Sequence, residues 1–187
     1  MSRPERIPGR RMKRIGQWVL IVVGAVAGAL LWPARGLVLY NAACVGQATA
    51  VRALLWLAID VNADADPGSN SYALSCAAAR GHTEVVKLLL AAGAHPNLSC
   101  CGATAIGFAA HAGHLDVVRV LLAAGANPNE GGPLGAAAWR GDREMVRVLL
   151  DAGASPAYDP DAGHDAAQAA RKAGHEEVAR MMEDSRR

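Results

Sequence analysis

One segment of this chain occurs twice, and the repetition constrains the fold more than any other feature of the sequence. Residues 79–97 read ARGHTEVVKLLLAAGAHPN, and residues 111–129, which begin 32 positions later, read HAGHLDVVRVLLAAGANPN. Self-similarity at a fixed spacing of 20–50 residues is typical of stacked supersecondary units, each of which packs only on its neighbours. The sequence therefore predicts a solenoid of repeated units.

Weaker copies extend the repeat in both directions, around Gly46 upstream and around Gly141 and Gly174 downstream. An alanine-rich stretch before each repeat glycine predicts a first helix, and the glycine fits a left-handed C-terminal cap. In the second helices, Leu89 and Leu121 occupy equivalent positions and are expected in the core. The end units are expected to present polar outer faces. The predicted units are approximately 35–64, 65–97, 98–129, 130–157 and 158–187.

The shared pattern, G-H-x-E-V-V-x-L-L-L-x-x-G-A-x-x-N, resembles the second half of an ankyrin repeat. The resemblance implies an all-α ankyrin-repeat solenoid of about five helix-turn-helix units joined by hairpin fingers. No unit has the complete Thr-Pro-Leu-His with which the family opens its first helix; the stretch from Thr104 is one partial match. Lower than average stability is therefore expected. The stretch 65–70 is about two residues longer than its counterparts, and 130–132 is about four shorter, so the finger is expected to be missing there.

The segment before the repeats predicts a membrane anchor. Residues 15–34 carry no charge, and 20 helical residues at about 1.5 Å each cross a bilayer core of about 30 Å. Trp18 and Trp32 lie near its two ends, where interfacial aromatic residues are common. Residues 1–14 hold six bases and one acid, whereas only Arg35 follows closely. The positive-inside bias thus predicts that the basic N-terminus over 1–14 is cytoplasmic. The transmembrane helix would span 15–34. The ankyrin-repeat domain over 35–187 would then lie outside the cytoplasm, in the periplasm or its equivalent.

A cleaved signal peptide is the alternative interpretation of the same segment. The candidate cleavage sites after Ala27 and Ala29 lie inside the apolar run, and the site after Ala34 has Trp32 where a small residue is needed. These features favour an uncleaved anchor over secretion.

Charge and motifs exclude several classes of function. Of the 19 bases and 17 acids, the part after residue 14 holds 13 and 16, a net charge of −3, which argues against nucleic acid as a partner. No nucleophile elbow, zinc-protease motif or phosphate-binding loop occurs. We therefore expect no catalytic residues, no cofactor and no small-molecule substrate. The histidines at the equivalent positions 82, 114 and 175 are interpreted as structural residues of the repeat.

The four cysteines lack the spacing of a metal site. They are Cys44, Cys76, Cys100 and Cys101. A disulfide would fit an oxidising compartment, but the sequence indicates no pairing, and free thiols are the favoured interpretation.

The resemblance also implies where a partner would bind. Ankyrin repeats use the finger tips and the two residues before each first-helix glycine. The candidate protein-binding residues are therefore Arg80, His111, Trp139, Arg140 and Lys172 on the helices, and Ser69, Ser71, Cys100 and Cys101 at the tips. Trp139 followed by Arg140 has the composition of an interface hot spot. The alternative is that Trp139 fills the gap left by the short finger. Trp56 is expected to pack toward the membrane or the core.

The expected function is that of a bacterial-type, membrane-anchored ankyrin-repeat scaffold that binds another protein without chemistry of its own. A cleaved, secreted effector or inhibitor with the same surface is the first alternative. An accessory subunit of a partner enzyme is the second.

Overall fold

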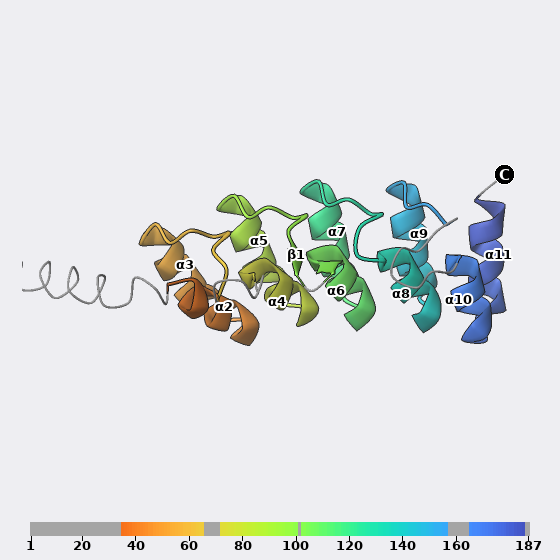
Figure 1. Ribbon diagram of the computed structural model, residues 1–187, viewed down its shortest axis with the longest axis horizontal. Helices are drawn as coiled ribbons and strands as arrows, with labels where there is room; N and C mark the ends of the chain where they lie inside the picture. The colour runs from red at the N-terminus through yellow and green to blue at the C-terminus, as the bar shows by residue number, and fades with distance from the viewer. Residues whose placement is uncertain (1–34, 66–71, 101, 157–164, 186–187) are drawn as a thin grey trace, which may run out of the picture. The chain divides into compact units, whose positions relative to one another are not determined.

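Helix pairs succeed one another in a row (Figure 1). The computed structural model describes residues 35–65, 72–100, 102–156 and 165–185, and the statements below concern these residues. The first and second helices of each pair are α2 (Arg35–Val45) and α3 (Ala48–Trp56), α4 (Ala73–Ala79) and α5 (Thr83–Ala91), α6 (Ala105–Ala112) and α7 (Leu115–Ala123), α8 (Pro133–Arg140) and α9 (Arg143–Asp151), and α10 (Ala166–Lys172) and α11 (Glu176–Asp184). The predicted all-α stack of helix-turn-helix units is confirmed.

Like helices pack on like helices along the row. The first helices α2, α4, α6, α8 and α10 form one layer, and the second helices form the other. Paired alanines at the centre of each first helix are buried, and their small side chains let the helices of this layer approach one another. These alanines are Ala42 and Ala43, Ala77 and Ala78, Ala109 and Ala110, Ala137 and Ala138, and Ala169 and Ala170.

The second helices supply most of the large core side chains. Leu89, Leu121 and Leu149 are each fully buried at equivalent positions, and Met182 takes this place in the last unit. The prediction that Leu89 and Leu121 are core residues is confirmed. A continuous apolar core of this kind runs through all the units and makes each depend on its neighbours.

An asparagine at the end of a unit ties it to the next one. Asn62, Asn97 and Asn129 each donate from Nδ2 to the carbonyl oxygen of the glycine after the next unit's second helix, at 3.1, 3.4 and 3.2 Å; these glycines are Gly93, Gly125 and Gly153. Each Oδ1 accepts from the backbone N–H two residues beyond that glycine, at 2.8, 2.8 and 2.7 Å. These asparagine hydrogen bonds pair backbone N–H and carbonyl groups that lie in the turns after the second helices and have no partner within a helix.

A short hairpin finger precedes α6. Strands β1 (Ser99–Cys100) and β2 (Ala103–Thr104) pair antiparallel, with Ser99 opposite Thr104. The buried Thr104 hydroxyl donates to the carbonyl oxygen of Glu130 at 3.0 Å, which braces the next turn. Before α8 no strand forms among the described residues, and Gly131 and Gly132 turn the chain directly into the helix with φ of 74° and 59°. The prediction of a missing finger is confirmed.

The N-terminal prediction falls on residues that the structure does not describe. In the described part of the chain, no helix combines the length and the apolar character needed to cross a bilayer. The expected anchor over 15–34 and the basic segment over 1–14 lie outside the described residues.

Candidate functional site

An open groove lies along the first-helix layer at α6, α8 and α10, with a volume of about 470 Å³. Its floor is made of small residues, and three larger rings border it. The lining residues are Ala103, Gly107, Gly131, Gly132, Gly135, Ala136 and Ala169, together with Phe108, His111 and Trp139. A hollow of small residues bordered by aromatic rings can receive an apolar side chain from a partner.

The missing finger of the fourth unit creates this groove. The shortened turn brings Gly131 against α6, so that a Cβ on Gly107 would collide with the Gly131 carbonyl oxygen. A Cβ on Gly131 would lie 2.7 Å from the Thr104 hydroxyl oxygen. Glycine is therefore required at both positions by close backbone approach. Because the turn is so short, nothing among the described residues covers the small side chains of α8 from this side.

Trp139 borders the groove without filling it. It is 58% exposed, so the structure does not support the alternative in which Trp139 packs into the space left by the short finger. His111, at the equivalent position of the preceding unit, is also exposed and lines the same groove. Two of the predicted site residues are thus brought together.

Phe108 is a groove residue that the sequence-based prediction missed. It lines both this groove and a neighbouring hollow of about 260 Å³, which also contains Tyr40, Tyr72, Cys76 and Arg80. Aromatic side chains therefore recur along the first-helix layer. A signal was available, because the only Phe of the chain stands where the neighbouring units have Cys76 and Ala136. A large residue at a position that is otherwise small marks a local departure from the repeat.

The other predicted site residues are more scattered. Arg80 and Cys100 line the smaller hollow. Lys172 is exposed at the end of α10 and borders neither hollow. Ser69, Ser71 and Cys101 lie outside the described residues.

The repeat histidines brace consecutive units, as expected. The Nε2 atom of His82 lies 3.1 Å from the carbonyl oxygen of Cys44, and its ring covers Gly46 so closely that a Cβ there would come within 2.6 Å of it. The rings of His114 and His175 lie in the same way against Gly81 and Gly141. The histidine before the second helix thus links the second, third and fifth units to the unit that precedes each of them.

Arg140 takes over this bracing role in the fourth unit, where Asp142 replaces the histidine. The Arg140 guanidinium lies against Gly113, and Nη1 donates to the carbonyl oxygen of His111 at 3.3 Å. This carbonyl is the counterpart of the Cys44 carbonyl that His82 contacts. Asp142 instead caps α9, accepting from the backbone N–H of Met145 at 3.0 Å. Arg140 was predicted as a binding residue, and the structure places its side chain in a structural contact.

A family model described as "Ankyrin repeats (3 copies)" matches residues 39–132, half of the chain. The chain belongs to the ankyrin-repeat family. A comparison with curated proteins gave no match.

Ankyrin repeats generally act as protein–protein interaction modules, and the family is typically not enzymatic. The pairs α8–α9 and α10–α11 lie beyond the matched residues and continue the same stack. The groove therefore spans the last matched ankyrin unit and the two that follow it.

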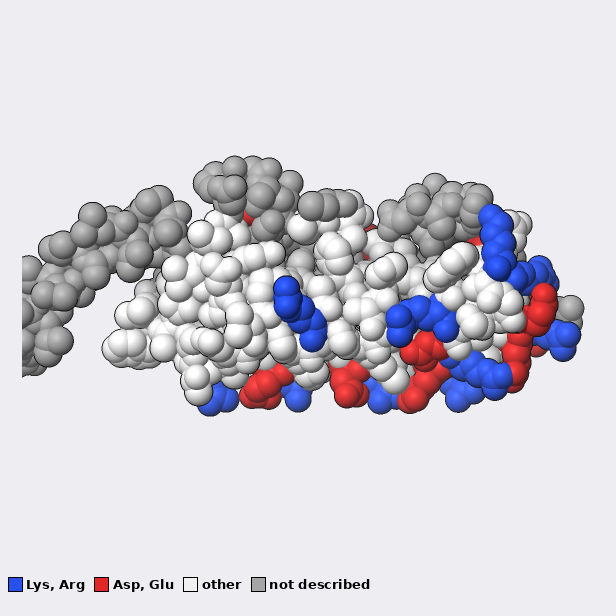
Figure 2. Space-filling model, turned by 90° about the horizontal axis from the view of Figure 1, so that it is seen from below, with Lys and Arg blue, Asp and Glu red and all other residues white. Residues whose placement is uncertain are grey.

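Charge is divided between the two layers of this ankyrin stack. The first helices contain no Asp or Glu, and their charged residues are all basic. On the second helices, Arg52 pairs with Glu84 at 3.4 Å, Arg119 with Glu144 at 2.5 Å, and Arg143 with Glu177. Figure 2 shows acidic and basic side chains alternating along one edge, beside a face that is mostly uncharged. These exposed pairs contribute little stability each. They lie on the second helices, whereas the first helices that border the groove carry no acid.

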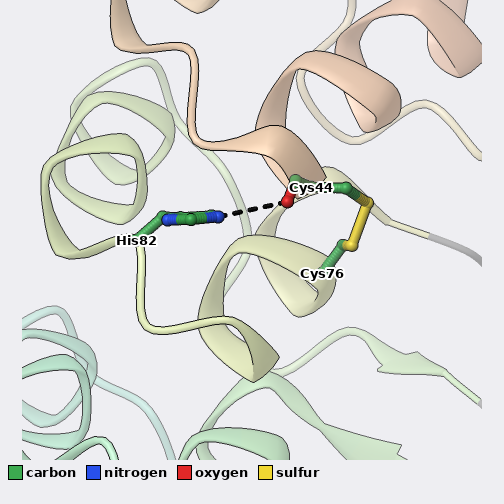
Figure 3. Close-up of a disulfide and its surroundings, with 3 residues drawn as sticks. All are labelled: Cys44, Cys76 and His82. Atoms are coloured by element: carbon green, nitrogen blue, oxygen red, sulfur yellow. Dashed lines mark hydrogen bonds between the residues drawn. A yellow bond between two sulfur atoms is a disulfide. The ribbon is translucent and has the colours of Figure 1, made fainter.

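A disulfide joins Cys44 of α2 to Cys76 of α4, with a Cα–Cα distance of 5.2 Å (Figure 3). The interpretation of these two cysteines as free thiols is therefore wrong. They occupy different positions in their units, two and five residues before the repeat glycine, so the repeat pattern gave no hint that they face each other. Packing of α2 on α4 brings them together. In the described ranges, no three His, Cys, Asp or Glu side chains gather as a metal site.

Proposed function

We propose that this chain binds another protein in the groove bordered by Phe108, His111 and Trp139. The observation that carries the proposal is the 58% exposure of Trp139 beside an apolar hollow of about 470 Å³. Tryptophan is one of the residue types enriched at interface hot spots. Binding is an equilibrium recognition by a preformed surface, with no bond made or broken.

The charge of the first-helix layer indicates the chemistry of the partner segment. Arg80, Arg140 and Lys172 are exposed on this layer, and none of its helices carries an acid. Complementarity therefore favours an apolar side chain flanked by neutral or acidic residues.

We also propose that a bacterial-type anchor over 15–34 holds the repeats outside the cytoplasm. The uncharged segment and the six preceding bases support this topology. The Cys44–Cys76 disulfide is an independent support, because disulfides persist mainly in oxidising compartments. Cleavage and secretion would place the repeats on the same side of the membrane. An accessory subunit of a partner enzyme would use the same groove.

The groove is tested by Trp139→Ala in the full chain, with Trp56→Ala as the control because Trp56 is also exposed but lies in the first unit. Since a hot-spot residue contributes more than about 2 kcal/mol and 1.4 kcal/mol is one decade, Trp139→Ala should weaken capture of the partner by at least about tenfold. The measurement is affinity capture from solubilised membranes, followed by titration of the protein recovered. Arg140 is left unchanged because of its contact with the preceding unit.

Equal capture by the wild type and by both variants would place the interface elsewhere, at the finger tips. An unfolded Trp139→Ala protein would show that the tryptophan is structural. Loss of capture in Trp56→Ala alone would move the interface to the first unit.

The topology is tested separately. A reporter that is active only outside the cytoplasm, fused after Arg187, is expected to be active because the bases before residue 15 hold the N-terminus inside. Good expression with an inactive reporter would place the repeats in the cytoplasm. A mature chain that starts after Ala27, Ala29 or Ala34 would replace the anchor with a secreted form.

A further inference from the structure

The first unit presents an apolar outer face. Its exposed large apolar residues are Leu37 at 43%, Val38 at 40%, Val45 at 65%, Trp56 at 86% and Leu57 at 59%. Among the described residues, Trp139 in the groove is the other large apolar side chain that is exposed. The prediction that the end units have polar outer faces is therefore wrong for this unit.

Two of these side chains, Val38 and Val45, border a hollow on the side of the hairpin that faces away from the stack. Val38 and Val45 of α2, with Ala53 and Leu54 of α3, line this hollow of about 480 Å³. Trp56 ends α3 and Leu57 follows it, so both exposed side chains lie one turn beyond Ala53, next to this hollow. The opposite side of the hairpin packs on α4 and α5. Ala73 and Leu89, the second-unit equivalents of Val38 and Leu54, are buried, so a preceding unit would cover this hollow in a longer solenoid. Trp56 and Leu57 lie beyond that hollow, because their equivalents Ala91 and Ala92 are exposed.

The apolar character is specific to this unit. The positions of Trp56 and Leu57 are occupied by Ala91 and Ala92 in the second unit and by Ala123 and Ala124 in the third. In the fourth unit they are Asp151 and Ala152. The repeat fold therefore does not require large apolar residues at these positions. Their presence in the first unit indicates that this unit contacts an apolar partner.

We infer that this face docks on the lipid bilayer, at the boundary between headgroups and acyl chains. The inference rests on the proposed anchor, because the uncharged segment over 15–34 is followed directly in the sequence by Arg35, the first residue of α2. Tryptophan is enriched at this boundary because its ring is apolar and its N–H is polar. The helices α2 and α3 contain Arg35 and Arg52 and no acid, so they do not repel anionic headgroups.

The test uses the tryptophans of the full chain as depth probes. Three variants keep one tryptophan each, at position 32, 56 or 139, with the others replaced by Phe. Each is reconstituted into phosphatidylcholine vesicles with bromine atoms on the acyl chains near the headgroups, which quench nearby tryptophan emission. Circular dichroism establishes that each variant keeps its helices.

The expected result is strong loss of emission for Trp32 and Trp56 and none for Trp139. Quenching of Trp32 without Trp56 would overturn the docking while the anchor stands, and a second copy of this chain would become the expected occupant. Quenching of Trp56 without Trp32 would keep the docking and reject the anchor. Absence of quenching at both positions would overturn both proposals. Equal quenching of Trp139 would mean that the whole domain lies on the bilayer, and would overturn docking through one end.

Discussion

Leu121→Ala is expected to lower the free energy of unfolding by about 2–5 kcal/mol, the range for truncating a fully buried leucine. Leu121 has no exposed surface and lies at the middle of the stack, between the second helices on either side. A cavity there weakens two interfaces between units, and the stability of a solenoid depends on such interfaces. The measurement is urea unfolding of the detergent-solubilised full chain, followed by the circular dichroism of its helices.

Leu122→Ala is the matched control, because the same atoms are removed one position along the same helix from a half-buried side chain. Its cost should be clearly smaller. Leu89→Ala, at the equivalent position of the preceding unit, should resemble Leu121→Ala. Similar unfolding curves for the wild type and Leu121→Ala would mean that the assigned register of the repeat is wrong.

The fold could be predicted because the sequence repeats its core. Leu89 and Leu121 recur at the repeat spacing with the same neighbouring residues. Once one second helix is placed correctly in the sequence, the bounds of the other second helices follow. The lack of a finger before α8 also followed from length alone, since the stretch 130–132 leaves no room for paired strands.

The candidate site was harder to predict because it depends on departures from the repeat. Trp139 and His111 were found by their equivalent positions, and they line one groove. Arg140 was assigned to binding by the same rule, but the histidine missing at position 142 leaves a carbonyl that its guanidinium contacts. Phe108 was missed because the rule considers only the residues next to the glycine. Residues at equivalent positions of two units occupy equivalent places in the stack. What such a residue contacts depends on which neighbouring side chains differ between the units.

The Cys44–Cys76 disulfide is expected to contribute about 3–4 kcal/mol to stability, from the loop-entropy relation for a sequence separation of 32 residues. Replacing both cysteines by serine should lower the free energy of unfolding by this amount. A reductant should lower the stability of the wild type to the same level. The measurement is urea unfolding of the full chain with and without reductant.

The double variant controls for the remaining thiols, because it keeps Cys100 and Cys101. Its stability should not respond to reductant. A response equal to that of the wild type would assign the effect to Cys100 and Cys101, and wild-type stability that ignores reductant would show that no disulfide supports the fold.

The loss should also be local, since the disulfide joins the first unit to the second. The first unit has a neighbour on one side only, so α2 and α3 pack on the stack through α4 and α5 alone. Without the covalent link, hydrogen exchange should rise in α2 and α3 and stay unchanged in α9, which has neighbours on both sides. A uniform rise over all helices would mean that the stack unfolds as one cooperative unit. A rise confined to the first unit would mean that the groove at α6, α8 and α10 survives reduction, and that the disulfide serves to hold the unit next to the proposed anchor onto the rest of the stack.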